Sequence, residues 1–348
     1  MMKSTENPLR SDLDHILKYT QGLWENLRGE RIFITGGTGF IGSWILESLV
    51  WADHKYNLGV EALILTRHAD AFRQKVPHIT SYPSINLCTG DICNFIFPPG
   101  EFKYIIHAAA EPSSRFILEQ QLTTFDTIVE GTRRTLLFAQ QCGAQKFLLT
   151  SSGAVYGLQP SEMQQLSEEF SGAPYCTDPR SAYGEGKRAA ETLCMLFSRQ
   201  AGFEAKIARC FTFVGAYLPL GAEFAIGNFI RDGFNGGPIR IEGDGTAYRS
   251  YLYAADMVIW LWMILFLGKP SYPYNVGSEN PINIAQLAQL VADQFEPRPN
   301  VEISKSPING YLPERYVPST RRAMVELGLH QSVDLVTALQ KTISFIRK

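Results

Sequence analysis

The feature that most constrains this chain is a glycine-rich turn between an apolar stretch and a helical pattern. Gly36 lies at the end of the apolar stretch 31–37, and Gly39 and Gly42 follow it in the spacing GxxGxxG. Apolar residues at helical spacing then continue to position 50. A side chain at these positions would block a tight turn and hold the backbone away from a phosphate at the positive end of the helix. The sequence therefore predicts a strand, a turn and a helix that bind the pyrophosphate of a dinucleotide.

Apolar strands alternate with helical segments over the first 150 residues. We predict strands at residues 31–37, 61–67, around 85–87, 103–110 and 146–152. They show no clean alternation of apolar and polar residues, so we expect a parallel sheet buried on both faces. Right-handed crossovers then give a doubly wound sheet, and the predicted fold class is α/β of the Rossmann type.

The texture of the sequence divides the chain into three predicted parts. Residues 1–29 form a helical extension, residues 30–210 the NAD(P)-binding Rossmann domain, and residues 211–348 mainly a smaller α/β substrate lobe, some of whose segments return to the Rossmann domain. Glycine and proline become frequent after residue 210, and helices are predicted at 284–295 and 333–345. The extension carries six apolar residues that approximate one helical face, namely Leu13, Ile16, Leu17, Leu23, Trp24 and Leu27.

Composition favours a cytoplasmic protein that binds small molecules. The net charge of -2 argues against a broad surface for nucleic acid or for an anionic membrane. The six cysteines are scattered, without zinc spacing, so we expect reduced thiols and no metal site. The amino-terminal residues lack the apolar core of a signal peptide, and the most apolar stretch, 257–267, is too short to span a bilayer and is read as a buried helix.

The candidate cofactor residues lie after the predicted strands. At the end of the second strand, a carboxylate would bind the 2′-hydroxyl of NAD, whereas a cation accommodates the 2′-phosphate of NADP. The chain has Thr66 and Arg67 there, which favours NADP, although Arg67 could also be a solvated charge or stack on adenine. The full set of candidates is Gly36, Thr38, Gly39, Phe40, Ile41, Gly42, Thr66, Arg67, Asp91, Ile92, Ala108, Ala109 and Ala110, with Tyr183 and Lys187.

Three further residues form a candidate catalytic set. Tyr183 and Lys187 are spaced i, i+4 and so lie on one side of a helix, about thirty residues after Ser152 at the end of a strand. A phenol with a pKa of about 10 is a poor base at neutral pH, but positive charge from Lys187 and a nicotinamide would stabilise its phenolate. Ser152 would hydrogen-bond the same substrate oxygen.

These motifs together resemble the extended short-chain dehydrogenase/reductase family, specifically its NAD-dependent epimerase/dehydratase group, which acts on nucleotide sugars. The resemblance implies that Asn228, Arg249 and Arg315 grip the nucleotide diphosphate; for the two arginines a surface or interdomain salt bridge is the alternative. It also implies a homodimer formed through two helices of each subunit. The motifs that carry it, in order, are TGGTGFIG, GDI, HAAA, EGT, LLTSSGAVYG, YGEGK, NFI, YRSYLYAAD and YNVGSE.

Departures from the family pattern narrow the activity. The 4,6-dehydratases resemble one another in a Thr-Asp-Glu sequence where this chain has Ser152, Gly153 and Ala154, and the decarboxylases carry a glutamate where Ala154 stands. Glycine and alanine supply no acid or base. Thr212 and Ala216 replace the Asn and Pro that are usual in epimerases, so the contacts of Thr212 with substrate are expected to differ.

The resemblance therefore leads to a nucleotide-sugar 4-epimerase in which Tyr183 is the acid and base and C4 is oxidised transiently. An NADPH-dependent nucleotide-sugar 4-ketoreductase is the close alternative, and Arg67 favours it. A reductase of another carbonyl compound and a non-catalytic NAD(P)-sensing protein also stay open.

Overall fold

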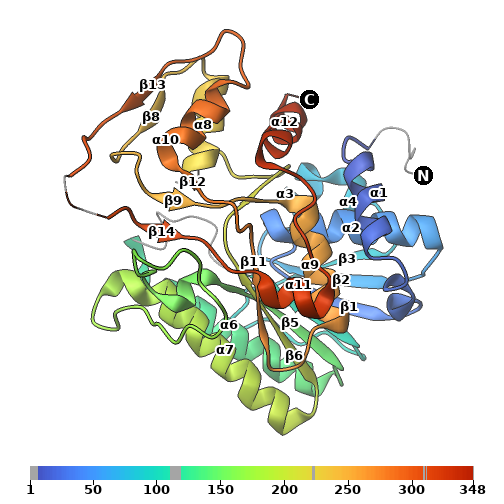
Figure 1. Ribbon diagram of the computed structural model, residues 1–348. Helices are drawn as coiled ribbons and strands as arrows, with labels where there is room; N and C mark the ends of the chain where they lie inside the picture. Colours follow the sequence, from blue (N-terminus) through green and yellow to red (C-terminus); the bar gives the residue numbers. More distant parts are fainter. Residues whose placement is uncertain (1–6, 110–118, 222–223, 309, 311, 348) are drawn as a thin grey trace.

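Seven parallel strands form the central sheet of the protein (Figure 1). The computed structural model describes residues 7–109, 119–221, 224–308, 310 and 312–347. The order β3-β2-β1-β4-β5-β6 within this sheet is that of a doubly wound fold, with β11 added beyond β6, so the predicted Rossmann fold class is confirmed. From one edge to the other the strands are β11 (Pro273–Val276), β6 (Glu204–Cys210), β5 (Lys146–Ser152), β4 (Tyr104–His107), β1 (Arg31–Thr35), β2 (Glu61–Thr66) and β3 (Ile85–Thr89).

Both faces of this sheet are buried, as the uniformly apolar strands predict. In β1, Ile32 and Ile34 pack on one side, and Phe33 packs on the other; all three side chains are fully buried. The ring of Phe33 lies 4.8 Å, centroid to centroid, from that of Phe138. The core therefore consists of two layers, one on each face of the sheet.

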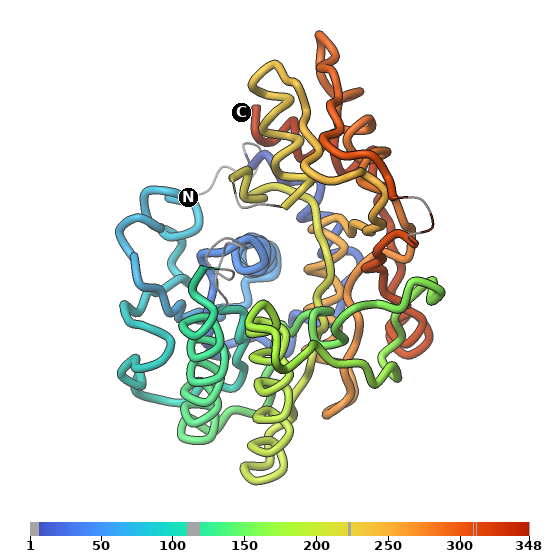
Figure 2. The backbone as a smooth tube through the Cα atoms, turned by 90° about the vertical axis from the view of Figure 1, so that its left-hand side faces the viewer, coloured from blue at the N-terminus to red at the C-terminus, as the bar shows by residue number. Residues whose placement is uncertain are grey.

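Helices cover the two faces. Helices α6 and α7 lie side by side on one face, and α2, α9 and the short α1 contribute to the apolar layer on the other (Figures 1 and 2). Helix α9 is the most apolar of them, and within the described residues no helix is long and apolar enough to cross a membrane. The bounds are α1 (Arg10–Tyr19), α2 (Phe40–Tyr56), α3 (Ala69–Lys75), α4 (Pro77–Thr80), α6 (Gln121–Gln141), α7 (Ala182–Ala201), α9 (Ala254–Leu267) and α11 (Arg321–Leu327).

The amino-terminal segment packs on this helical layer. Helix α1 is followed by the 3-10 turn η1 (Trp24–Leu27), so the apolar face expected in one helix is carried by two pieces. The interruption coincides with Gly22, whose φ of 86° is incompatible with a continuing helix. The buried carboxylate of Asp12 accepts hydrogen bonds from the Tyr253 hydroxyl at 2.9 Å and from the Lys341 ammonium at 2.8 Å, which ties α1 to the later part of the chain.

Short strands and helices after residue 210 form the smaller assembly at the top of Figure 1. Strand β9 pairs with β12 and β14, and β8 pairs in parallel with β13, while β7 and β10 form a separate pair. The elements are β7 (Phe213–Val214), α8 (Ala225–Phe234), β8 (Ile239–Ile241), β9 (Tyr248–Arg249), β10 (Leu252–Tyr253), β12 (Ile282–Asn283), α10 (Ile284–Ala292), β13 (Val301–Ile303), β14 (Arg315–Tyr316) and α12 (Leu335–Ile346).

Strand β4 is shorter than the apolar stretch 103–110 predicts. Its last paired residue, His107, lies opposite Thr35, the last residue of β1. Beyond Thr35 the chain enters the glycine-rich turn, so the ladder between β1 and β4 ends there. Ala108 still donates its backbone N–H to the Thr35 carbonyl at 3.1 Å, and the backbone of Ala108 and Ala109 lies against Gly36.

Candidate active site

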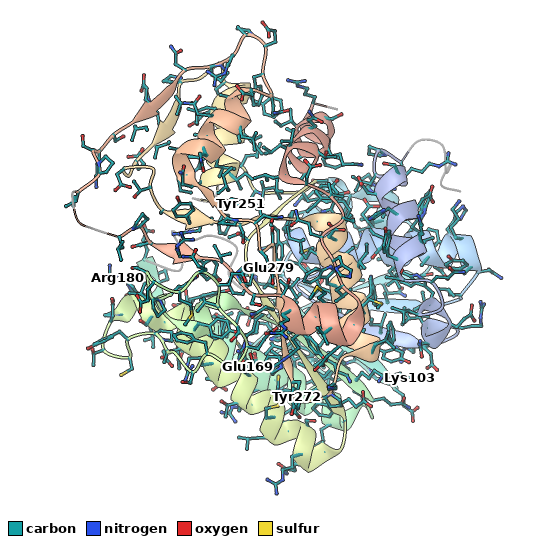
Figure 3. All side chains as sticks on the ribbon, in the orientation of Figure 1. Lys103, Glu169, Arg180, Tyr251, Tyr272 and Glu279 are labelled. Atoms are coloured by element: carbon teal, nitrogen blue, oxygen red, sulfur yellow. The ribbon has the colours of Figure 1, made fainter. Side chains whose placement is uncertain are left out.

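A cavity of about 1020 Å³ opens at the carboxyl ends of the sheet strands, where doubly wound folds bind their ligands. One side is formed by the sheet edge and the glycine-rich turn, and the other by segments of the smaller assembly. Tyr251, labelled in Figure 3 between these two parts, lines it. The predicted site residues that line the cavity are Gly36, Thr38, Gly39, Phe40, Ile41, Gly42, Thr66, Arg67, Asp91, Ile92, Ala108, Ala109, Ser152, Tyr183, Lys187, Thr212 and Arg249.

Two of the predicted residues that the structure describes do not line the cavity, and a third cannot be compared. Ala110 lies outside the described residues. Asn228, on α8, does not line the cavity, and its side-chain oxygen accepts a hydrogen bond from Arg231 at 3.1 Å. Arg315 does not line it either, although its strand neighbour Tyr316 does. The roles of Asn228 and Arg315 stay predictions.

The glycine-rich turn has the geometry of a phosphate cradle. Gly36 has a φ of 70°, and a Cβ there would overlap the backbone of Ala108. A Cβ at Gly42 would overlap the carbonyl of Gly36, so both positions require glycine. Gly39 precedes the first residue of α2 and faces the cavity, and a Cβ there would touch only the Gly36 carbonyl at 3.4 Å. The first turn of α2 thereby directs its free backbone N–H groups toward the cavity.

Two cationic side chains and an imidazole lie at the β2 end of the cavity. Arg67 and His68 follow β2, and Lys75 ends α3; all three line the cavity. Asp91 lies nearby, after β3, and accepts the backbone N–H of Cys93 at 2.9 Å, which fixes its carboxylate. Sequence reasoning found Arg67 but missed its neighbour His68, and it missed Lys75, which the packing of α3 beside β3 brings to the same end.

Ser152, Tyr183 and Lys187 meet at the opposite end of the cavity. Ser152 is the last residue of β5, and its Oγ accepts the backbone N–H of Ala154 at 3.1 Å. Tyr183 and Lys187 lie on the first turns of α7, with the Lys187 Nζ 5.9 Å from the centroid of the Tyr183 ring. Burial raises the pKa of Tyr183, and the Ser152 hydroxyl acts in the opposite direction. The i, i+4 spacing therefore places phenol and ammonium together as the sequence predicts.

The Lys187 side chain is almost completely buried. Its Nζ donates a hydrogen bond of 2.8 Å to the carbonyl of Thr150, and burial lowers its pKa to about 8. The neighbouring His107 is buried too, and this burial, with the charge of Lys187, lowers the pKa of His107 to about 3. The imidazole is therefore neutral, and its nitrogens contact the hydroxyls of Thr35 at 2.8 Å and Thr132 at 3.1 Å. It joins the ends of β1 and β4 to α6 beneath the cavity.

The strand pair β9 and β14 decides which side chains reach the cavity from the smaller assembly. Tyr316 lies opposite Arg249, and Arg315 lies opposite Tyr248. Successive residues of a strand point to opposite faces, so Arg249 and Tyr316 share the cavity side, while the Arg315 guanidinium packs on the Tyr248 ring at 4.4 Å. Within the described part of the chain, Nη1 of Arg315 is buried without a hydrogen-bond partner.

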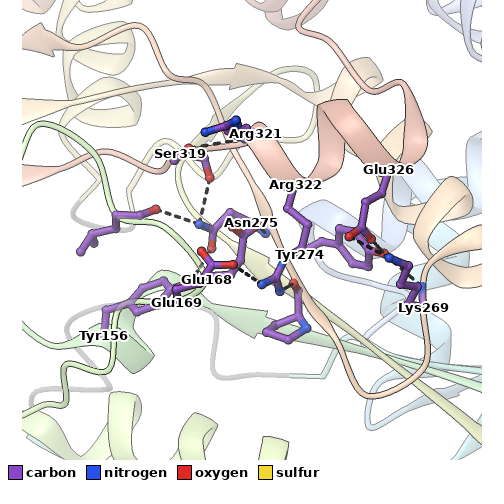
Figure 4. A network of polar contacts seen from close by, with 12 residues as sticks. Tyr156, Glu168, Glu169, Lys269, Tyr274, Asn275, Ser319, Arg321, Arg322 and Glu326 are labelled. Carbon is purple, nitrogen blue, oxygen red and sulfur yellow. Dashed lines mark hydrogen bonds and ion pairs between the residues drawn. The ribbon is translucent and has the colours of Figure 1, made fainter.

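A polar network fixes the chain that follows Tyr316. Asn275 donates through its amide to the carbonyls of Leu166 at 2.9 Å and Ser319 at 3.0 Å, and it accepts from the Tyr156 hydroxyl at 2.8 Å (Figure 4). The side chain of Gln159 accepts the backbone N–H of Val317 at 2.9 Å. The network therefore pins the segment next to Tyr316 against the sheet.

Sequence reasoning missed several residues of the lining. The most consequential is Tyr316, whose hydroxyl lies 2.6 Å from the position that a Cβ on Gly153 would occupy. Its one sequence signal is its place beside Arg315 in a strand-like pair. The thiol of Cys210, at the end of β6, lines the same region, and burial raises its pKa to about 12. The described residues contain no cluster of side chains that could hold a metal ion.

Comparisons with known proteins agree with this architecture. The model of the NAD dependent epimerase/dehydratase family matches residues 32–277. UDP-glucuronic acid decarboxylase 1 of Xenopus tropicalis is 30% identical over 92% of this chain and 72% of its own, and UDP-glucuronic acid decarboxylase 6 of Arabidopsis thaliana is 31% identical over 88% and 85%.

Solved structures show the same fold over almost the whole chain. An epimerase of Methanothermobacter thermautotrophicus has a TM-score of 0.79 at 20% identity, covering 98% of this chain and 96% of its own. UDP-glucose 4-epimerase of Thermotoga maritima, solved with UDP-glucose, has a TM-score of 0.74 at 21% identity, covering 91% and 98%. The chain is therefore an enzyme of the extended short-chain dehydrogenase/reductase type and belongs to the NAD-dependent epimerase/dehydratase family.

Proposed function

We propose that the protein is an NAD(P)-dependent nucleotide-sugar 4-epimerase. The observation that carries the proposal is one continuous cavity, with a glycine phosphate cradle at its base, Ser152, Tyr183 and Lys187 along it, and Arg249 on the facing strand pair. Because Gly36 and Gly42 leave no room for a side chain and the first turn of α2 points at the cavity, the residues fit a dinucleotide. A bound nicotinamide would supply a site that takes up and returns a hydride.

The chain's own residues would handle the proton. Tyr183 would take the proton from the C4 hydroxyl as C4 becomes a ketone and give it back when the ketone is reduced from the opposite face. Ser152 would donate a hydrogen bond to the same oxygen, and Lys187 would favour the phenolate by its charge. Since the ketone is reduced again, the reaction has no net redox change, and a base beyond Tyr183 is not needed.

The nucleotide diphosphate would lie on the smaller assembly. Arg249 lines the cavity and carries the fork that matches phosphate oxygens at two points. Arg315 and Asn228 are proposed to add to this grip, and Nη1 of Arg315 retains a donor that, among the described residues, meets no acceptor. Thr212 is a smaller contributor, because its hydroxyl already donates to the carbonyl of Ser250.

We propose NADP as the favoured cofactor. The cations Arg67 and Lys75, with the imidazole of His68, line the cavity where the ribose next to adenine would lie, and cations there accommodate a 2′-phosphate. Arg67→Ala and Lys75→Ala should each weaken NADP binding more than NAD binding, as measured by titration of both cofactors. Equal losses for the two cofactors would show that these cations do not read the phosphate.

A second candidate is a nucleotide-sugar 4-ketoreductase. The cations Arg67 and Lys75 favour it, because a reductase that consumes NADPH needs the phosphate-bearing cofactor, whereas an epimerase regenerates its own. The decarboxylase activity named for the relatives is less well supported, because Ala154 lines the cavity where those enzymes are expected to carry a glutamate. Reduction of another carbonyl compound and cofactor sensing without catalysis stay open.

One experiment separates these functions. The purified protein is incubated with sugars linked to UDP, CDP, GDP or dTDP, and products and cofactor are followed by mass spectrometry. An epimerase interconverts two sugars with no change in the reduced cofactor, a ketoreductase consumes NADPH stoichiometrically with a keto-sugar, and a decarboxylase releases CO₂ from a uronic acid. Failure of every nucleotide sugar to bind would reject the proposal.

We also propose that the protein forms a homodimer in the cytoplasm. Leu122 and Leu137 of α6 and Leu196 of α7 are exposed leucines on two adjacent helices. The six cysteines are free thiols, which suits a reducing compartment. Light scattering on the wild type and on Leu196→Glu tests the dimer: the variant should have the molar mass of a monomer, and a monomeric wild type would reject the dimer.

A further inference from the structure

Two phenols from distant parts of the chain flank the Ser152 hydroxyl. Tyr183 comes from α7 and Tyr316 from β14, and both line the cavity beside Ser152. The Ser152 hydroxyl opposes the rise in pKa that burial imposes on both phenols, and the Tyr316 hydroxyl lies 2.6 Å from the place of a Cβ on Gly153, the residue next to Ser152. The charge of an ionised Tyr183 raises the pKa of Tyr316, so the two would not ionise together. One of them must keep its proton while the other exchanges it.

Gly153 makes room for the second phenol. A Cβ at Gly153 would lie 2.6 Å from the Tyr316 hydroxyl and 2.7 Å from the Phe211 ring, so any larger residue would displace one of them. The Tyr316 ring packs on Phe211, with centroids 4.7 Å apart, and the Asn275 network holds the chain just beyond it. The phenol is therefore placed at Ser152 by packing from three sides.

The hydrogen-bonding capacity of Ser152 fixes a direction for its proton. A hydroxyl donates once and accepts twice. The Ala154 N–H occupies one acceptor position at 3.1 Å. If the Tyr316 hydroxyl donates to the second, Ser152 has no acceptor position left and can only donate, toward Tyr183 and the substrate oxygen beside it.

We propose that Tyr316 is a positioning residue that donates its hydroxyl proton to Ser152, so that Ser152 donates toward Tyr183 and the reacting oxygen. The inference rests on the proposed function, because it assigns Tyr183 the proton that moves. No bond other than hydrogen bonds changes at Tyr316. As a consequence, Tyr316 keeps its proton, and only Tyr183 exchanges a proton with the sugar.

The test measures the ionisation of Tyr183 directly and needs no sugar. The protein is labelled with tyrosine carrying ¹³C at Cζ, loaded with NAD⁺ and titrated with pH by NMR; loss of one of the signals of the 15 tyrosines in Tyr183→Phe assigns that residue. Tyr316→Phe should raise the pKa of Tyr183 by about one unit, the value of one hydrogen bond to a charged oxygen. An unchanged Tyr183 titration in Tyr316→Phe would overturn the proposal.

The Ser152→Ala background tests whether Tyr316 acts through the serine. Ser152→Ala should raise the pKa of Tyr183 too, and Tyr316→Phe should then add nothing. If the two substitutions shift the pKa of Tyr183 additively, Tyr316 acts independently of Ser152, and the proposal is rejected. Tyr104→Phe is the control, since it removes a buried phenol that does not line the cavity and whose hydroxyl donates to the Asn26 carbonyl, and it should leave the Tyr183 titration unchanged.

A second variant covers the case in which Tyr316→Phe does not fold. Gly153→Ala keeps the phenol but forces its hydroxyl away from Ser152, so it should shift the Tyr183 titration in the same direction. A normal titration in Gly153→Ala would also contradict the proposal. If the pKa shifts appear but no nucleotide sugar is turned over, the proposed function fails alone; if sugars are turned over and Tyr183 titrates unchanged, the inference fails alone.

Discussion

The two halves of the cavity are built in different ways. The cofactor half takes its lining from a few short stretches, each at the end of a parallel strand, with Gly36 to Gly42 as the largest. The substrate half is assembled from separate pieces, among them Thr212, Arg249, Ile284 and Tyr316. The comparison teaches that one half is encoded by local motifs, whereas the other depends on how distant strands pair.

The largest expected effect lies where the halves meet. Tyr183→Phe removes the proton carrier and should lower turnover by about 10²–10⁴-fold with whichever nucleotide sugar is active. Cofactor binding should persist, because the glycine cradle is untouched. The measurement is steady-state turnover alongside cofactor titration, with the exposed Tyr175→Phe as the control. Turnover near the wild-type value would show that Tyr183 is not the catalytic acid and base.

The next effect tests the cofactor half. Gly36→Ala should cost about 2–4 kcal/mol of folding or cofactor-binding free energy, because its φ is left-handed and its Cβ would overlap Ala108. Gly59→Ala is matched, since Gly59 also has a positive φ but open space around it, and it should cost only about 1–2 kcal/mol without loss of cofactor. Urea unfolding and cofactor titration measure both. Equal costs would mean that close approach at the turn is unimportant.

A smaller effect tests the substrate half. Arg249→Ala should weaken binding of the nucleotide diphosphate by about 1.5–3 kcal/mol, the usual value of hydrogen bonds to charged groups. Arg315→Ala should cost less, because its guanidinium packs on Tyr248 rather than lining the cavity. Calorimetric titration with UDP, CDP, GDP and dTDP provides the measurement, and the exposed Arg240→Ala serves as the control. A larger loss of binding free energy in Arg315→Ala than in Arg249→Ala would contradict the inference that strand alternation directs Arg249, and not Arg315, toward the cavity.

The smallest expected effect is a pH dependence of the free energy of unfolding, caused by His107 beneath the cofactor half. His107 binds its proton only near pH 3 in the folded protein but near pH 6.5 when unfolded, so the unfolded state holds more protons between these values. The free energy of unfolding should therefore fall as pH drops below 6.5, by about 1.4 kcal/mol per pH unit from this group. His107→Gln should remove that part of the slope in urea titrations from pH 6.5 to 4.5. The exposed His54→Gln should keep it, and an equal loss in both variants would exclude His107 as the cause.

Sequence patterns predicted the cofactor half in detail. Gly36, Ser152 and the pair Tyr183 and Lys187 belong to motifs in which a few residues fix both the backbone and the neighbours, and the structure brings them to one cavity. The patterns were less informative for the substrate half. They pointed to Arg315, whereas the pairing of β14 with β9 turns the next residue, Tyr316, toward the cavity.

The sequence by itself determined the glycine turn and the meeting of phenol and ammonium on α7, because each follows from interactions between residues close along the chain. It also indicated the parallel sheet, through apolar strands that alternate with helices. Only the tertiary structure decided that Lys75 joins Arg67 and that Tyr316 lines the same cavity as Ser152. In a strand, a shift of one residue in register exchanges the two faces. That register is set by partners far away in the sequence, so no local pattern could reveal which side chain would face the cavity.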